Sequence, residues 1–334
     1  MKNSNIILLV IDTLRYDYAM SDPYFKELSE KGLFFDRMYS PSTFTNANMS
    51  SVRSGMYPPR HGWRSWPKDY PLGKNIKTLE DFLDDAGYCF NRINMPMKPG
   101  ETQEFIENEQ VFQKMTEQEP FFLYSQCMHI HDSRYDGARG GEKDYATFLP
   151  PAAGFIKTAF EQAEAQNFDN DTLWVIMSDH GVGMKDDTLT GEGLDVGAGQ
   201  LYDFRNRIYC ALIGPGIEPE VLTGAYSQID LLPSILDYCE IQPTIPDGFL
   251  EIQGVSVFEE PDPDRYVYLE AQSPNSIWPS EQPNVFGATD GRFKLMITPD
   301  GYKFYNLVVD PEEKNDLMKS IDFKSMLDFV EEIK

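Results

Sequence analysis

Acidic and imidazole side chains follow two apolar runs of the sequence, close to the point where each run ends. Asp12 comes directly after Asn5–Ile11, and Asp179 and His180 follow Thr172–Met177 after a single serine. Carboxylates combined with an imidazole suit a divalent cation, so these residues could form a metal site at the edge of a sheet. A helix cap and a satisfied core histidine would account equally well for Asp179 and His180 on local grounds.

Hydroxyl side chains are concentrated in a second polar segment. The stretch Tyr39–Gly62 has a Ser/Thr-rich turn, small residues typical of a helix start, and a Gly-Met-Tyr-Pro exit. A threonine in the first turn of such a helix would face backbone N–H donors and the positive end of the helix dipole, where an anion could be held. Most Ser/Thr-rich helix starts are only caps, so this segment alone does not predict a site.

The apolar runs that precede these polar residues predict the elements that position them. Asn5–Ile11 and Thr172–Met177 are continuous and rich in β-branched residues, which is typical of strands buried on both faces of a parallel sheet. Pro120–Met128 has the same form and is followed by His129 and His131. Segments with helical character separate the runs, at 78–86 and 155–165. This alternation predicts an open α/β sheet with its site at the carboxyl ends of the strands.

The pattern changes after about residue 245. Short apolar runs separated by Asp-Gly turns predict an antiparallel sheet, and a final helix follows. The expected strands are 265–270, 293–297 and 302–306, and the expected helix is 323–333. We therefore expect a catalytic α/β domain over 1–245 and a small antiparallel α+β subdomain over 246–334, with the boundary in the Pro-rich stretch Pro243–Pro246.

Composition restricts the class of partner. The chain has 334 residues, of which 41% are hydrophobic, so it can bury a sizeable core. Its 54 Asp and Glu against 29 Lys and Arg give a formal net charge of −25, which opposes binding to nucleic acid. The run Ile6–Ile11 is much shorter than the roughly 20 residues of a membrane span, and it lacks the flanks of a signal peptide. We expect a cytoplasmic protein that does not bind membranes, and the oligomeric state stays open.

The order of the fragments along the chain resembles the sulfatase-like branch of the alkaline phosphatase superfamily. The similarity runs nearly from end to end. It is carried by Asn5–Asp17, Ser51–Gly62, Thr78–Tyr88, Pro120–Leu123 with His129 and His131, Ser178–Gly181, Leu201–Asp203, Gly214–Ile217, Gln228–Pro233 and Tyr305–Leu317. The resemblance implies a mixed, largely parallel sheet sandwiched by helices, and an enzyme that hydrolyses phosphoric or sulfuric esters.

The resemblance also points to a nucleophile. Counted back from Gly55 along the signature, Thr45 stands where a sulfatase has the cysteine that becomes formylglycine. Threonine cannot undergo that oxidation, and Ala47 and Met49 replace the proline and arginine of the maturation motif. Thr45 resembles instead the nucleophile of the superfamily's phosphodiesterases, phosphonate hydrolases and phosphoryl transferases, in which a metal-bound alkoxide attacks phosphorus.

The implied metal site holds one ion. Its ligands would be Asp12, Asp179 and His180, with Thr45 as a further ligand. A second ion about 3.5–4 Å away would need additional carboxylates or imidazoles. The chain has four histidines with none after His180, and His61 is assigned a structural role in the turn after the signature helix. We expect one Mn²⁺, Mg²⁺, Ca²⁺ or Zn²⁺ ion, since a mostly oxygen ligand set does not distinguish among them.

The implied substrate is a small anionic ester. By the resemblance, His131 or His129 would contact this substrate or protonate its leaving group. Asn46 and Asn94 are candidate oxyanion or substrate donors, although a surface or turn role would explain each of them as well.

The sequence departs from the family pattern in three places. Thr13 replaces a second aspartate, no Lys/His pair is visible around Met95 and Met97, and 195–200 has small residues where relatives place a charged group. The leading hypothesis is hydrolysis or transfer of a phosphate or phosphonate ester through a covalent Thr45 intermediate. The alternatives are a sulfate-ester hydrolase without formylglycine, and a degenerate member that binds an anion without turnover.

Overall fold

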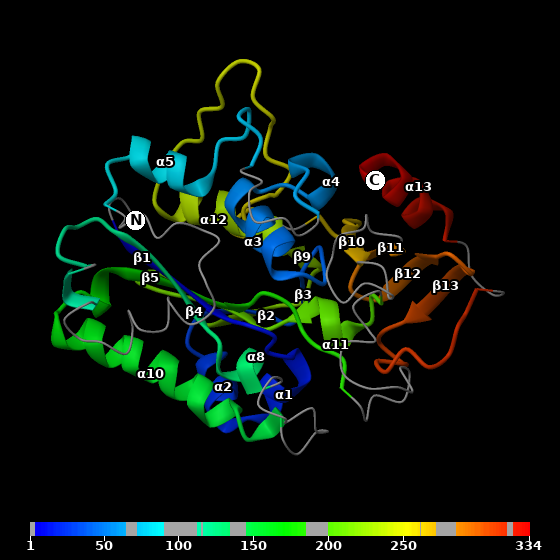
Figure 1. Cartoon of the computed structure of the whole chain (residues 1–334), viewed down its shortest axis with the longest axis horizontal. Coiled ribbons are helices and arrows are strands. Elements are labelled where there is room, and N and C mark those ends of the chain that lie inside the picture. Colours follow the sequence, from blue (N-terminus) through cyan, green and yellow to red (C-terminus); the bar gives the residue numbers. More distant parts are fainter. Residues whose placement is uncertain are drawn as a thin grey trace.

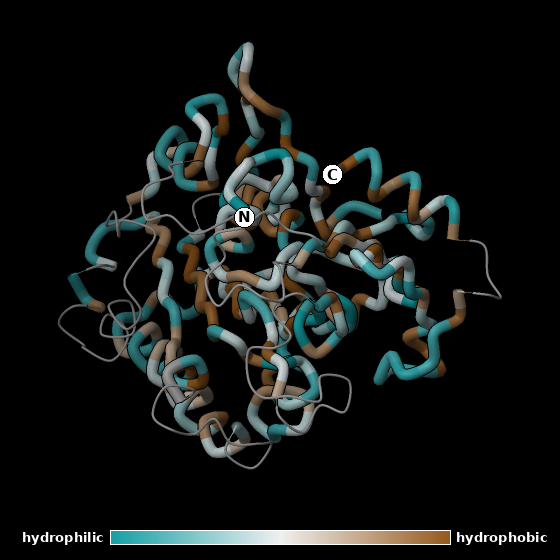
Figure 2. The backbone as a smooth tube through the Cα atoms, turned by 45° about the vertical axis from the view of Figure 1, so that its right-hand side comes forward, coloured by the Kyte–Doolittle hydropathy of each residue, from teal (hydrophilic) through white to brown (hydrophobic). Residues whose placement is uncertain are grey.

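The structure of the chain is a computed structural model. It describes residues 4–64, 72–89, 112–114, 116–133, 145–184, 200–260, 262–271, 285–318 and 323–334. In Figure 1 the larger sheet runs between two layers of helices, and a smaller antiparallel sheet lies to its right beside the C-terminal helix. Figure 2 shows the most hydrophobic stretches of the chain gathered toward the middle of the fold.

The larger sheet has the strand order β4-β1-β5-β7-β2-β8. Its strands are β1 (Asn5–Ile11), β2 (Leu33–Phe35), β4 (Phe122–Cys127), β5 (Thr172–Ser178), β7 (Cys210–Ile213) and β8 (Glu220–Leu222). β1 pairs in parallel with both β4 and β5, which places the carboxyl ends of these three strands at one edge. β7 runs antiparallel to β5. The predicted mixed, largely parallel sheet is therefore confirmed.

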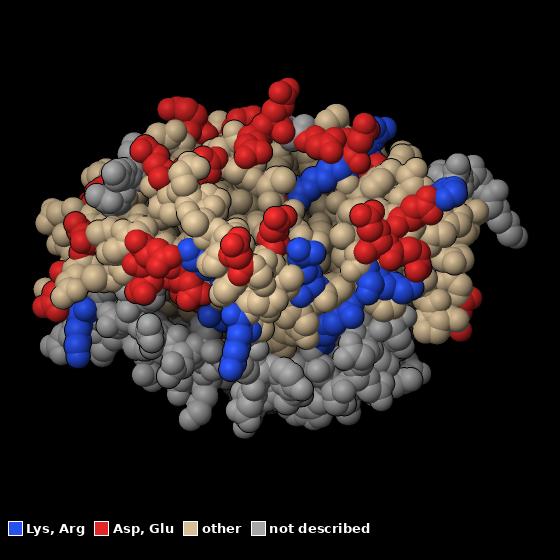
Figure 3. Space-filling view, turned by 90° about the horizontal axis from the view of Figure 1, so that it is seen from above, with Lys and Arg blue, Asp and Glu red and all other residues tan. Residues whose placement is uncertain are grey.

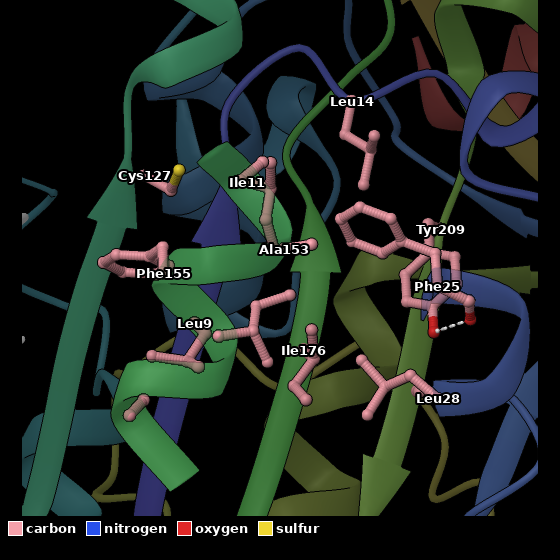
Figure 4. Close-up of a cluster of buried hydrophobic side chains, with 14 of the residues drawn as sticks. Leu9, Ile11, Leu14, Phe25, Leu28, Cys127, Ala153, Phe155, Ile176 and Tyr209 are labelled. Atoms are coloured by element: carbon pink, nitrogen blue, oxygen red, sulfur yellow. Dashed lines mark hydrogen bonds between the residues drawn. The ribbon is translucent and has the colours of Figure 1, made fainter. Parts of the chain in front are cut away.

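Alternate side chains of β1 pack against the two helix layers. Leu9 lies in a buried cluster with side chains of α2 and α10, part of which is shown in Figure 4. Leu8 lies in a second buried cluster with side chains of α3, α5 and α12. Both faces of the strand are covered, which explains its continuous apolar sequence. The helices of the first layer are α1 (Tyr16–Ser21), α2 (Pro23–Leu28), α8 (His129–Ser133) and α10 (Leu149–Ala165), and those of the second are α3 (Thr45–Ser54), α5 (Leu79–Asp85) and α12 (Leu231–Tyr238).

The helix α10 begins earlier than the sequence analysis predicts. It starts at Leu149 rather than at Phe155, and Pro150 and Pro151 lie in its first turn. Two prolines suggest a break in the helix, but proline is tolerated in a first turn because the N–H groups there have no partner within the helix.

A short three-stranded sheet and several short helical turns complete this part of the fold. The sheet has the order β6-β3-β9. The elements are β3 (Met38–Tyr39), α4 (Pro58–His61), the 3-10 turn Asp169–Asp171, α11 (Asp203–Asn206), β6 (Arg207–Ile208), β9 (Tyr226–Ser227) and the 3-10 turn Gln228–Asp230.

The C-terminal sheet is antiparallel throughout, as predicted. Its strands are β10 (Val267–Ala271), β11 (Val285–Thr289), β12 (Phe293–Thr298) and β13 (Gly301–Asn306), followed by α13 (Lys324–Ile333). β11 was not predicted from the sequence, because it is short and has Gly287 at its centre. The division at residue 245 stays a prediction, and the backbone N–H groups of Gln253 and Gly254 donate to the carbonyl of Gly55 in the first region.

The surface of the described residues is predominantly acidic on the face drawn in Figure 3. Asp and Glu side chains lie in several groups among uncharged residues, with Lys and Arg side chains between them. This agrees with the expected weak affinity for nucleic acid, which stays a prediction. Among the described helices, none combines the length and the apolar character that crossing a membrane requires.

Candidate active site

Three side chains that could bind a metal converge at the carboxyl edge of the larger sheet. Ligand atoms of Asp12, Asp179 and His180 lie within 4.8 Å of one another, and all three residues are buried. Two atoms bound to one ion at about 2.0–2.6 Å are at most about 4–5 Å apart, so the cluster could close on a single cation with small movements. The structure thus brings together three residues that the sequence predicts as ligands, and their role in binding stays a prediction.

Strand pairing sets this proximity. The last residues of β1 and β5 are paired in parallel register, so Asp12 and Asp179 leave the sheet side by side. The Oδ1 atom of Asp179 accepts hydrogen bonds from the backbone N–H groups of Thr13, at 2.9 Å, and His180, at 2.8 Å. These two donors fix the orientation of the carboxylate.

The second oxygen of the Asp179 carboxylate has a different environment. Oδ2 is buried, accepts no hydrogen bond among the described residues, and lies 3.5 Å from Nε2 of His180. A buried carboxylate oxygen without a donor is costly unless a cation compensates it. Asp12 adds a second buried carboxylate, so the donor set of two carboxylates and an imidazole fits a divalent cation.

Thr13 occupies the position where the family pattern has a second aspartate, and its backbone is strained. Its φ angle is +61°, which β-branched residues rarely adopt. The Thr13 hydroxyl donates to the carbonyl of Asp12 at 2.7 Å, and the Thr13 carbonyl accepts from the hydroxyl of Tyr145 at 2.8 Å. This conformation directs the Thr13 N–H to Asp179 and turns its hydroxyl back to the main chain.

The ring of His180 presents its Nε2 atom to the site. Nδ1 lies 2.7 Å from the carbonyl oxygen of Gly181, which can only accept, so Nδ1 carries the proton of the neutral ring. The lone pair of Nε2 is then directed to its other neighbour, the hydroxyl oxygen of Thr45, at 3.2 Å. Nε2 can accept the Thr45 proton or bind a cation, and in each case it acts on the predicted nucleophile.

Thr45 is the first residue of α3 and is half-buried. The carbonyl of Phe44 accepts the first helical hydrogen bond, from the N–H of Asn48 at 3.1 Å. The backbone N–H groups at the start of the helix therefore have no partner within the helix, and Thr45 belongs to this first turn. An anion bound there would lie at the same end of the helix as the predicted nucleophile.

Asn48 links the turn before Thr45 to the main chain of Asp179, and it was not predicted from the sequence. Its Oδ1 accepts from the N–H of Ser42 at 2.8 Å, and its Nδ2 donates to the carbonyls of Ser42 at 2.8 Å and Asp179 at 3.0 Å. Gln228 donates to the same Asp179 carbonyl at 3.0 Å. Both amides are fully buried. The only hint in the sequence is an asparagine three residues after Thr45, among the small residues at the start of the helix.

The structure describes three of the four remaining candidate residues, His129, His131 and Asn46. His129 and His131 are on α8, which follows β4 directly, and the N–H of Asp12 donates to the last carbonyl of β4 at 3.0 Å. Both histidines thus start from the edge that carries the metal cluster, and their contact with substrate stays a prediction. Asn46 is half-buried in the first turn of α3. Asn94, like Met95, Met97 and 195–199, lies outside the described residues.

His61 has the environment of a structural residue, in agreement with its assignment. It is buried, its Nδ1 accepts from the N–H of Trp63 at 3.1 Å, and its Nε2 lies 3.0 Å from the hydroxyl of Ser51. Burial, with the nearby charge of Arg64, lowers the pKa of His61 to about 3. The ring is therefore neutral and joins the end of α4 to α3.

Comparisons with known proteins agree with this fold. The model of the sulfatase family matches residues 89–241. A putative sulfatase from Bacteroides thetaiotaomicron superimposes with a TM-score of 0.76 at 16% identity, covering 98% of this chain and 90% of the other. The phosphonate monoester hydrolase of Agrobacterium radiobacter superimposes with a TM-score of 0.69 at 13% identity, covering 98% and 94%.

A third similar structure is a protein in complex with its substrate D-glucosamine-2-N,6-O-disulfate. It has a TM-score of 0.76 at 13% identity, and the match covers 99% of this chain and 97% of the other. Among curated proteins, none matches the sequence. The family model matches less than half of the chain, and the solved structures show that the chain shares their fold.

Proposed function

We propose that this protein is a metal-dependent hydrolase of small anionic esters in which Thr45 is the nucleophile. The observation that carries the proposal is the position of the Thr45 hydroxyl, 3.2 Å from His180 Nε2 and beside the buried cluster of Asp12 and Asp179. A hydroxyl needs activation to attack an ester at neutral pH, and this cluster can supply it. Helix capping would not by itself bring together the side chains that follow two strands and the side chain that begins α3.

Each residue has a distinct task in the proposed reaction. Asp12, Asp179 and His180 would hold a divalent ion, which when bound makes a hydroxyl easier to deprotonate and offsets charge on the ester. The Thr45 hydroxyl loses its proton to solvent, its oxygen bonds to phosphorus, and the bond from phosphorus to the leaving oxygen breaks. The backbone N–H groups at the start of α3 offer donors to the substrate's oxygens, which carry most of the charge.

Proton transfer to the leaving oxygen is the proposed task of His131 or His129. An alkoxide leaving group is poor unless it is protonated as it departs. Water hydrolyses the Thr45 ester in the second half of the reaction and regenerates the hydroxyl; an acceptor alcohol in place of water would make the protein a transferase. Asn46 and Asn94 are proposed to donate to the substrate.

A phosphate or phosphonate ester is the leading substrate class. Thr45 cannot become formylglycine, and Met49, in place of the arginine of the maturation motif, is buried and has no polar group. The similar structure of a phosphonate monoester hydrolase supports this choice. A sulfate ester is the second candidate, and it is supported by the sulfatase-family match and by the similar structure that contains a sulfated sugar. The expected cytoplasmic location rests on the sequence alone.

A substrate screen tests the proposal. The protein is stripped with a chelator and reloaded separately with Mn²⁺, Mg²⁺, Ca²⁺ or Zn²⁺. It is then assayed with p-nitrophenyl phosphate, bis-p-nitrophenyl phosphate, p-nitrophenyl phenylphosphonate and p-nitrophenyl sulfate. We expect metal-dependent release of p-nitrophenol from a phosphorus ester, and a covalent adduct on Thr45 by intact mass after rapid acid quench.

The other results of the screen are also informative. Release from the sulfate alone would select the second candidate. Binding of inorganic phosphate or sulfate without turnover of any ester, with every metal, would support the non-catalytic alternative and exclude the proposed function. Thr45→Ala serves as the control for contaminating hydrolases.

A further inference from the structure

A hydrogen-bonded chain leads from β4 to the carboxylate of Asp12. The side-chain Nε2 of Gln126 donates to Oδ2 of Asp12 at 2.6 Å. The hydroxyl of Tyr124 donates to Oε1 of Gln126 at 2.7 Å. Tyr124 and Gln126 are two residues apart on one strand, so their side chains lie on the same face of the sheet. β4 and β1 are paired in parallel register, which brings Gln126 next to the end of β1.

The orientation of the Gln126 amide follows from its neighbours. The ionised carboxylate of Asp12 only accepts hydrogen bonds, so the amide nitrogen must face it. The amide oxygen then needs a donor, and the Tyr124 hydroxyl provides one. Flipping the amide would place its oxygen against the carboxylate, so only one orientation satisfies both partners.

Tyr124 is suited to act as a permanent donor. It is buried, and burial together with the nearby charges of Asp179 and Asp12 raises the pKa of its hydroxyl well above the usual value. The hydroxyl therefore keeps its proton at physiological pH. A buried tyrosine locked by packing restricts the Gln126 side chain, which in turn restricts the carboxylate.

We propose that Gln126 is a positioning residue that sets the rotation of the Asp12 carboxylate, and that Tyr124 holds Gln126 in the required orientation. This inference rests on the proposed function, because it concerns the same metal cluster. A directed hydrogen bond holds the carboxylate in one orientation before an ion binds, so less conformational freedom is lost on binding. Groups that orient metal ligands in this way typically change metal affinity by about 10- to 100-fold when removed.

Calorimetric titration of the stripped full-length protein with Mn²⁺ tests this proposal. Gln126→Leu removes the donor while keeping a similar volume, and we expect the Kd for Mn²⁺ to rise about 10- to 100-fold. Tyr124→Phe removes only the hydroxyl that fixes the amide, and we expect a smaller rise, of about 3- to 10-fold. Tyr209→Phe is the matched control: it removes a buried hydroxyl that donates to the Phe25 carbonyl at 2.9 Å and to none of the three predicted ligands, so the Kd should stay unchanged.

A second measurement separates positioning from a general loss of structure. If Gln126 acts through the metal site, the activity that Gln126→Leu loses at low Mn²⁺ returns when Mn²⁺ is raised in proportion to the new Kd. Gln126→Asn, which keeps an amide on a shorter side chain, is the substitute if the leucine variant does not fold, and its Kd should also rise.

The possible results decide between distinct conclusions. An unchanged Kd in a folded Gln126 variant would overturn the positioning role and leave the proposed function intact. A raised Kd in the Gln126 variants with an unchanged Kd in Tyr124→Phe would overturn the part assigned to Tyr124. If the unaltered protein binds no divalent ion, the positioning role fails together with metal dependence, while the Thr45 adduct measurement still tests the nucleophile by itself.

Discussion

The hydroxyl oxygen of Thr45 lies 3.2 Å from Nε2 of His180, although the two residues are far apart in the sequence. Because Nδ1 of the neutral ring donates to the Gly181 carbonyl, the Thr45 hydroxyl is the donor in this contact. In the proposed function, a cation held by His180 would compete with that hydrogen bond, so metal binding and activation of Thr45 would be coupled.

Replacement of Thr45 should separate chemistry from folding. We expect Thr45→Ala to reduce kcat by at least about 10³-fold, since it removes the attacking oxygen. Stability should change by less than about 1 kcal/mol, because a half-buried hydroxyl contributes little to packing. The measurements are ester hydrolysis and urea unfolding. Thr45→Ser keeps the oxygen and should keep measurable activity; turnover by Thr45→Ala within a few-fold of the parent would remove Thr45 from the mechanism.

The number of metal ions follows from the ligands at the sheet edge. Asp12, Asp179 and His180 provide one set of ligand atoms, and no other such group is found among the described residues. We expect one tightly bound divalent ion per chain after stripping and reloading, measured by elemental analysis. Asp179→Asn should lower the occupancy to below half at stoichiometric metal, because it removes a buried anionic ligand. Two tightly bound equivalents would mean that further ligands exist, and none would favour the non-catalytic alternative.

His61 should make stability depend on pH in the acidic range. The pKa of His61 is about 3 in the folded protein against about 6.5 in an unfolded chain, so between these values the unfolded state binds more protons. The contribution of the neutral His61 ring to the free energy of unfolding is complete above about pH 6.5 and is lost as the pH falls toward 3. Between pH 7 and pH 5 the free energy of unfolding should fall by about 2 kcal/mol from this residue alone.

The matched variant for this prediction is His61→Gln. Its unfolding free energy, measured by urea titration at both pH values, should be lower at pH 7 but should fall less on acidification. Parallel pH dependence in the two proteins would show that His61 does not titrate as its burial predicts.

A buried ion cluster joins the C-terminal sheet to the catalytic region. The ammonium of Lys294, fully buried on β12, pairs with Asp203 and lies 2.9 Å from Glu313. Lys294→Met would leave the buried Glu313 without its cation and Asp203 with only Arg207, 3.9 Å away, so we expect the free energy of unfolding in urea to fall by about 3–5 kcal/mol. Lys324→Met is the control, because Lys324 forms an exposed pair with Asp328 on α13, and its loss should cost less than about 0.5 kcal/mol. Equal effects of the two substitutions would contradict the buried role of Lys294.

The sequence by itself determined the strands of the site and the polar residues at their ends. β1 and β5 are buried on both faces, and a continuous apolar, β-branched run has no other stable place in a fold of this kind. A series of weak fragments in a fixed order was enough to predict the fold, which the similar solved structures share, and a resemblance to sulfatases, whose family model matches residues 89–241. Asp12, Asp179 and His180 could be chosen because they follow these runs directly.

The tertiary structure alone decided which polar residues support the site. Asn48 and Gln126 have no sequence pattern of their own, because their partners are the Asp179 carbonyl, on a distant strand, and the Asp12 carboxylate, on the neighbouring one. The antiparallel β7 and the short β11 also depend on pairing between segments far apart in the chain. Periodicity and spacing report local burial, whereas hydrogen bonds across the fold depend on the register between strands, which no single segment encodes.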